Sequence, residues 1–101
     1  MLYKDSVYER ASYIVLRNNA PEGTCISSSY MELIHEDEGI VIVECDLEFD
    51  IDCYGETQRF RKKLEVTFCE PNGKIDEVWY GKRILNDEKV IKKIFMEAVL
   101  G

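Results

Sequence analysis

The fold of this chain is decided by residues 40–54, which read IVIVECDLEFDIDCY. From Val41 to Cys53 every odd position is apolar, and from Glu44 to Asp52 every even position is acidic. Strict alternation with a period of two is typical of a β-strand that buries one face. Asp and Glu are poor strand formers, so the pattern rather than the composition predicts this strand.

A hairpin is predicted directly after this strand. Residues 54–57, YGET, fit a two-residue turn with Gly55 at its first central position, as a type II′ turn requires. The alternation resumes over residues 57–69. With Gly55 and Glu56 as the loop, the opposite residues are Asp52–Arg59, Asp50–Arg61, Glu48–Lys63, Asp46–Glu65 and Glu44–Thr67. The first three pairs join opposite charges, and each contributes about 0.2–1 kcal/mol and helps to set the register.

The flanking segments predict two helices and two more strands. Apolar residues at helical spacing predict a helix over residues 5–19, and the breakers at 18–23 end it. Residues 30–34 and 74–84 are predicted strands, and Asn86 or Asp87 caps a last helix. The predicted fold class is therefore α+β. An N-terminal helix, a four-stranded antiparallel β-meander and a C-terminal helix form one domain over residues 1–101, with both helices on one sheet face. In architecture alone, this order is similar to cystatin-like folds, and a fold does not define a function.

Charge is distributed unevenly along the chain. The net charge is −7, which argues against a generally basic nucleic-acid binder. Residues 18–58 contain eleven acids and no Lys or Arg, whereas residues 59–101 contain ten bases and seven acids. Such an asymmetry marks either an interaction surface or two halves that neutralise each other in the fold.

The acids that the predicted hairpin leaves without a base form a candidate binding patch. These residues are Glu36, Asp37, Glu38, Glu44 and Asp46, with Glu32 and Glu65 nearby. We expect a non-enzymatic protein-binding module whose partner is a protein with a basic surface. Two alternatives stay open: a small-ligand-binding or structural module of cystatin-like architecture, and a nucleic-acid mimic that occupies the groove of a basic protein.

Trp79 falls on the outer sheet face in the predicted register. An exposed Trp there indicates a partner interface or a homodimer through that face, unless the register is shifted and Trp79 lies in the core. Bases beside an aromatic also occur in nucleic-acid-binding sheets. Direct nucleic-acid binding is nevertheless disfavoured, because the net charge is negative and three of the four bases are predicted to pair with acids. The four bases on this face are Arg59, Arg61, Lys63 and Arg83.

No catalytic, cofactor or metal site is expected from the sequence. The glycines are scattered rather than grouped in a phosphate-binding loop, and His35 is the only imidazole. Four cysteines, Cys25, Cys45, Cys53 and Cys69, lack the close spacing of a zinc site. The chain also lacks a recognisable signal peptide and a membrane span, so we expect a cytoplasmic protein with free thiols.

Overall fold

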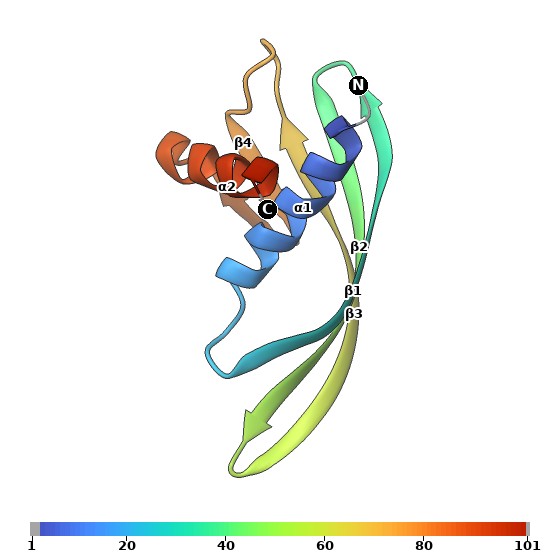
Figure 1. Cartoon of the computed structure of the whole chain (residues 1–101), viewed down its shortest axis with the longest axis vertical. Coiled ribbons are helices and arrows are strands. Elements are labelled where there is room, and N and C mark those ends of the chain that lie inside the picture. Colours follow the sequence, from blue (N-terminus) through green and yellow to red (C-terminus); the bar gives the residue numbers. More distant parts are fainter. Residues whose placement is uncertain (1–2, 101) are drawn as a thin grey trace.

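The computed structural model describes residues 3–100, with their side chains from Ser6 onward, and over this range it contains two helices and five strands. The elements are α1 (Tyr3–Asn18), β1 (Thr24–Asp37), β2 (Ile40–Cys53), β3 (Glu56–Cys69), β4 (Glu77–Tyr80), β5 (Arg83–Leu85) and α2 (Glu88–Leu100). Each strand pairs antiparallel with the next, so the sheet order is β1-β2-β3-β4-β5. Both helices lie on the same face of this meander (Figure 1). The α+β class and the terminal helices are confirmed.

The sheet has one strand more than the sequence predicts. The predicted strand over residues 74–84 is divided into β4 and β5 by a two-residue turn at Gly81 and Lys82. Gly81 has a φ of 60°, a conformation that glycine adopts at little cost. In addition, the loop after β3 runs from Glu70 to Asp76, so β4 begins later than predicted.

The turn between β2 and β3 lies one residue earlier than predicted. Tyr54 and Gly55 form the loop, and both have positive φ angles, 51° and 82°, as in a type I′ turn. Cys53 therefore pairs with Glu56, and the predicted loop of Gly55 and Glu56 is wrong. Each residue of β2 is therefore opposite a β3 residue two positions earlier than predicted. The observed pairs are Asp52–Thr57, Asp50–Arg59, Glu48–Arg61, Asp46–Lys63 and Glu44–Glu65.

The first strand is longer than predicted. β1 begins at Thr24 instead of residue 30, and it forms one edge of the sheet. Two irregularities interrupt its pairing with β2, one between Ile26 and Ser28 and one between Leu33 and His35. Between them, from Ser28 to Leu33, the register is regular.

The core lies between the helices and the inner sheet face. Phe68 is fully buried, and its ring makes edge-to-face contacts with Tyr8 at 5.2 Å and Phe95 at 5.5 Å between centroids. The odd positions of β2 from Val41 to Leu47 are buried, as the alternation predicts. Beyond them the β2–β3 hairpin extends past the helices, and its side chains become more exposed (Figure 1).

The C-terminal helix is capped as predicted. Asp87 Oδ1 accepts hydrogen bonds from the backbone N–H groups of Lys89 and Val90, at 3.0 and 3.4 Å. The helix then buries Ile91, Ile94 and Ala98 against the sheet and α1. Over residues 3–100, neither helix combines the length and the apolar character that crossing a membrane requires.

Candidate functional site

The outer sheet face, opposite the helices, carries three neighbouring rows of residues that run across the strands. Their members follow from the observed pairing. The first row is Glu32–Glu44–Glu65, the second is His35–Ile42–Thr67–Trp79–Ile84, and the third is Asp37–Ile40–Cys69–Glu77. The second row, in which Ile42, Trp79 and Ile84 are apolar, is thus flanked on both sides by rows that contain acids. We call it the apolar row.

Trp79 lies on the outer face, as predicted, and the alternative position in the core is wrong. Its side chain is 41% exposed, and the neighbouring Ile84 is 40% exposed. The indole Nε1–H donates a hydrogen bond of 3.2 Å to Glu77 Oε1. This bond fixes the orientation of the ring while leaving much of the ring surface open to a partner.

Three glutamates lie side by side in the first row. Glu44 is half-buried on β2 and is directly opposite both Glu32 on β1 and Glu65 on β3. Like charges directly opposite each other in a sheet are destabilising. The row therefore concentrates negative charge at one border of the apolar row.

Asp46 does not belong to an unpaired patch, contrary to the prediction. Its carboxylate accepts two hydrogen bonds from Arg61, at 3.1 Å from Nε and 2.8 Å from Nη2. These bonds, with the charges of Arg61 and Lys63, hold the pKa of Asp46 below its usual value. The prediction failed because the shifted turn places Lys63, instead of Glu65, opposite Asp46.

The other predicted acids are divided between the two sheet faces. Asp37 is exposed in the third row beside Ile40, and Glu38 is exposed in the adjoining turn with a φ of 52°. Glu36 pairs with Val41, whose side chain is in the core, so the register places Glu36 on the helix-covered face. The structure therefore places Asp37, Glu44 and Trp79 on the same outer face, on β1, β2 and β4, with Glu38 at its border. Glu36 lies on the other face, and Asp46 is paired with Arg61.

The apolar members of this face were not identified from the sequence, although a signal was present. Residues 40–43 read IVIV, so Ile40 and Ile42 occupy outer positions where the rest of the strand has acids. This interruption of the alternation marks the place where the outer face becomes apolar. Ile84 could not be found in this way, because its strand is only three residues long.

The basic residues of the sheet do not form a cluster beside Trp79. Arg59 Nε bonds Asp50 Oδ1 at 3.0 Å, and Arg61 bonds Asp46. Arg83 pairs with Tyr80, whose neighbour across the sheet is the buried Val66, so Arg83 is not on the outer face as predicted. Positive charge on the outer face is thus located on the β2–β3 hairpin, where carboxylates oppose it.

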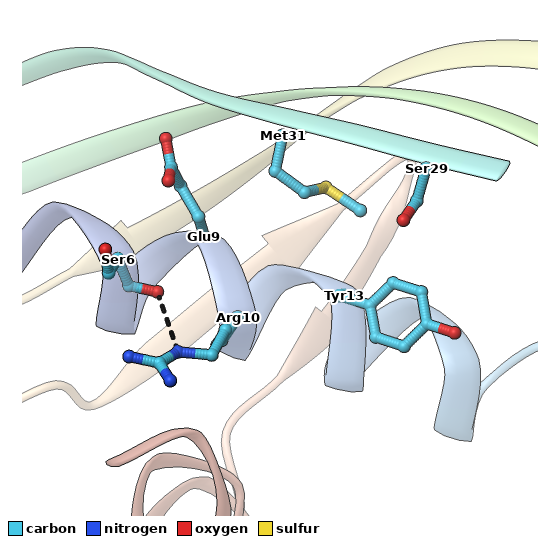
Figure 2. Close-up of a pocket in the computed structure, with 6 residues that line it drawn as sticks. All are labelled: Ser6, Glu9, Arg10, Tyr13, Ser29 and Met31. Carbon is cyan, nitrogen blue, oxygen red and sulfur yellow. Dashed lines mark hydrogen bonds between the residues drawn. The ribbon is translucent and has the colours of Figure 1, made fainter. Parts of the chain in front are cut away.

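A groove lies at the edge of the sheet, between α1 and β1 (Figure 2). Its volume is about 540 Å³, and it is lined by Ser6, Glu9, Arg10, Tyr13, Ser29 and Met31. Arg10 Nε donates a hydrogen bond of 3.4 Å to the carbonyl oxygen of Ser6. Glu9 Oε2 accepts one of 3.3 Å from the backbone N–H of Leu33 on β1. Ser29 and Met31 pair with the buried Leu47 and Cys45, so the groove lies between α1 and the helix-facing side of β1.

The four thiols are free and differ in their surroundings. Cys25 and Cys53 are exposed, Cys69 is half-buried and Cys45 is buried. Burial raises the pKa of the Cys45 thiol to about 12, so this thiol remains protonated at neutral pH. In the part of the chain that the structure describes, no three His, Cys, Asp or Glu side chains are grouped to hold a metal ion.

Comparison of this chain with models of known protein families, with curated proteins and with solved structures gave no match.

Proposed function

We propose that this chain is a non-enzymatic protein-binding module that uses its outer sheet face. We call this surface the acid-rimmed face, formed by Ile40, Ile42, Trp79 and Ile84 with Glu32, Glu44 and Glu65 on one side and Asp37 and Glu77 on the other. The proposal rests on one observation: a half-exposed Trp79 beside the exposed Ile84, in a row that lies between two rows containing acids.

The composition of the acid-rimmed face resembles that of protein interfaces. Interface cores are enriched in aromatic residues, and their rims are polar and accessible to solvent. A complementary partner would present apolar side chains to Trp79 and basic side chains to Glu44 and its neighbours. We infer a partner protein with a basic border around an apolar contact, and a cytoplasmic location in which the exposed Cys25 and Cys53 stay reduced.

The acidic row supports the same proposal through its energetic cost. Glu32, Glu44 and Glu65 repel one another, and the core contains none of them. A surface arrangement that lowers stability without contributing to packing is consistent with a role in binding. Nucleic-acid mimicry receives less support, because Arg61 and Arg59 neutralise Asp46 and Asp50 in the row of carboxylates along β2.

Affinity capture with matched variants tests this proposal. The chain is immobilised at low salt, and bound proteins are quantified by mass spectrometry for the wild type, Trp79→Ser, Glu44→Lys and Glu22→Lys. Glu22 is exposed in the loop between α1 and β1, so Glu22→Lys makes the same charge change away from the acid-rimmed face. A partner is expected to be lost with the first two variants, to be retained by the third and to dissociate as salt increases. Equal capture by all four proteins would contradict the proposal.

A further inference from the structure

One edge of the sheet has backbone groups that no other strand of the chain pairs. β1 pairs with β2 on one side only, and the groove of Figure 2 lies between its helix-facing side and α1. The Leu33 N–H donates to Glu9 on α1, so it points away from β2. In a regular antiparallel strand the backbone groups of every second residue point to the same side. Because the register is regular from Ser28 to Leu33, the N–H and C=O groups of Ser29 and Met31 also point away from β2.

Within the short segment from Ser28 to Met31, this edge lacks the bulges, charges and prolines that usually protect a sheet from pairing with another chain. Residues 24–31 contain no charged residue and no proline, and the pairing with β2 is regular between the irregularities at Ser27 and Ile34. The opposite edge differs, because β5 has three residues and begins with Arg83, directly after Lys82. Of the two edges, β1 is therefore the one available for a further strand.

We propose that two copies of this chain associate through β1, antiparallel and about a twofold axis at Tyr30, and join their sheets into one. In this register Ser29 of each copy is opposite Met31 of the other. Opposed residues of this kind exchange two N–H···O=C bonds, so the two pairs form four hydrogen bonds. All four involve the backbone groups of Ser29 and Met31 that point away from β2 in the single chain.

Neighbouring registers satisfy these groups less well. An axis at Ser29 would place Met31 opposite Ser27, which lies in the irregular part of β1. An axis at Met31 would place Ser29 opposite Leu33, whose N–H is already bonded to Glu9. The axis at Tyr30 is the one that uses only free groups within the regular segment.

The side chains at the axis also favour a second copy as the occupant. Tyr30 is 63% exposed on the outer face and would meet Tyr30 of the second copy, which forms a stabilising aromatic cross-strand pair. Met31 of the second copy would lie beside Ser29, on the side of the sheet where Tyr13 lines the groove. Glu32 of each copy would be opposite Ser28 of the other. The acidic residues of β1 from Glu32 onward would therefore not lie opposite the same residues of the second copy.

Disulfide trapping tests the register directly. In a background with Cys25 and Cys53 replaced by Ser, the Tyr30→Cys variant places two thiols opposite each other at a non-hydrogen-bonded pair. Their Cα atoms would be about 4.5 Å apart, within the range that a disulfide spans. Ser28→Cys is the matched control on the same strand face, because two such thiols would be about 13 Å apart along the strands. A cross-linked dimer is expected on a non-reducing gel for Tyr30→Cys and not for Ser28→Cys.

A second variant tests the hydrogen bonds without a new thiol. Ser29→Pro removes an N–H group that pairing through β1 needs and that β2 does not use. Light scattering over a concentration series to the millimolar range is expected to show a dimer for the wild type. The dissociation constant of the dimer should be higher for Ser29→Pro by about tenfold or more, whereas its circular dichroism spectrum should be unchanged.

Three outcomes would overturn the proposal. They are a single-chain mass for the wild type throughout the series, a dimer in which Tyr30→Cys cross-links no better than Ser28→Cys, and a dimer that Trp79→Lys dissociates. The last outcome would place the dimer contact on the acid-rimmed face instead of the β1 edge. Partner capture that depends on Trp79 and Glu44 is measured separately, so failure of the dimer is distinguishable from failure of the proposed function.

Discussion

The backbone N–H of Glu70 donates a hydrogen bond of 2.7 Å to the carbonyl oxygen of Gly39. This bond joins the β1–β2 turn to the loop that follows β3. The approach is close: a Cβ atom on Gly39 would lie 3.0 Å from the Glu70 carbonyl oxygen and 3.2 Å from Pro71 Cα. Glu70 also accepts a hydrogen bond of 2.7 Å from the hydroxyl of Tyr8 on α1. Three segments therefore meet at Glu70.

Gly39→Ala is expected to destabilise the chain more than Gly55→Ala. Both glycines are the second residue of a type I′ turn, with φ angles of 76° and 82°. Both substitutions incur the left-handed backbone cost of about 1–2 kcal/mol. An added Cβ atom would lie within 4 Å of other atoms at Gly39 but not at Gly55. The free energy of unfolding, measured with urea, should therefore fall by about 1 kcal/mol more for Gly39→Ala than for Gly55→Ala. Equal losses would show that the loop after β3 moves freely away from the turn.

Tyr54→Asn is expected to stabilise the chain. Tyr54 is fully exposed at the tip of the β2–β3 hairpin and has a φ of 51°, which is unfavourable for an aromatic residue. Asn-Gly is the preferred pair for a type I′ turn, and no buried contact is lost. We expect a gain of about 0.5–1 kcal/mol, observed as a higher Tm. A lower Tm would show that the ring contributes to stability despite its exposure.

Glu44→Gln is expected to increase stability at low salt. The substitution keeps the shape of the side chain and removes the charge that Glu32 and Glu65 repel from both sides. The gain should be about 0.2–1 kcal/mol and should decrease as salt screens the repulsion. Glu22→Gln, on an exposed loop, is the control. A gain that does not change with salt would exclude repulsion within the row as its cause.

The ion pair of Asp46 with Arg61 predicts a defined pH dependence. Hydrogen bonding to Arg61 lowers the pKa of the folded Asp46 carboxyl below its ordinary value of 3.8. The pair therefore stabilises the fold above that pH, and the stabilisation is lost as the pH falls through the lower folded value. The stability difference between the wild type and Asp46→Asn should be largest near neutral pH and should disappear in acid.

A double-mutant cycle assigns this pH dependence to the pair. In an Arg61→Gln background, Asp46→Asn should change stability by the same amount at neutral and at acid pH. If the difference persisted without Arg61, another group would be responsible for the lowered pKa. Unfolding by urea at a series of pH values provides both measurements.

The cysteines are expected to react in the order of their exposure. With iodoacetamide at mildly alkaline pH, Cys25 and Cys53 should be alkylated first, because they are exposed. Cys69 should react more slowly, since burial and the nearby Glu77 and Asp76 raise the pKa of its thiol. Cys45 should react only after unfolding, because its pKa is about 12. Intact-mass spectrometry follows the sequence of additions, and early alkylation of Cys45 would contradict its burial.

Much of the fold could be predicted from hydrophobic patterning, because strands with one buried face show it clearly. The alternation of residues 40–53 is reproduced in the burial of Val41, Val43, Cys45 and Leu47. The capping of α2 by Asp87 was also recognisable from the sequence. β1 and β5 were less evident, because β1 carries a run of serines and β5 has only three residues.

The main error in the candidate site came from a single turn. The type II′ assignment required Gly55 at the first central position, but that position is occupied by Tyr54 in a left-handed conformation that tyrosine rarely adopts. Moving the loop by one residue shifts every cross-strand pair by two positions. Asp46 thereby gained Lys63 and Glu44 gained Glu65, so the strongest repulsion lies at Glu44 instead of Asp46. Trp79 was placed correctly because its register depends on β3 and not on this turn.

The order of the strands also affects how this chain can fold during synthesis. Each strand pairs with its neighbour in the sequence, so the hairpins of the sheet can form one after another as they leave the ribosome. α1 is made before the five strands, yet it packs against α2, which is made after them, and Arg17 bonds Glu97 across this contact at 2.9 Å. We therefore expect α1 to remain without its full set of contacts until translation has passed α2, and the last step of folding this sheet and its helices to join α1 to α2.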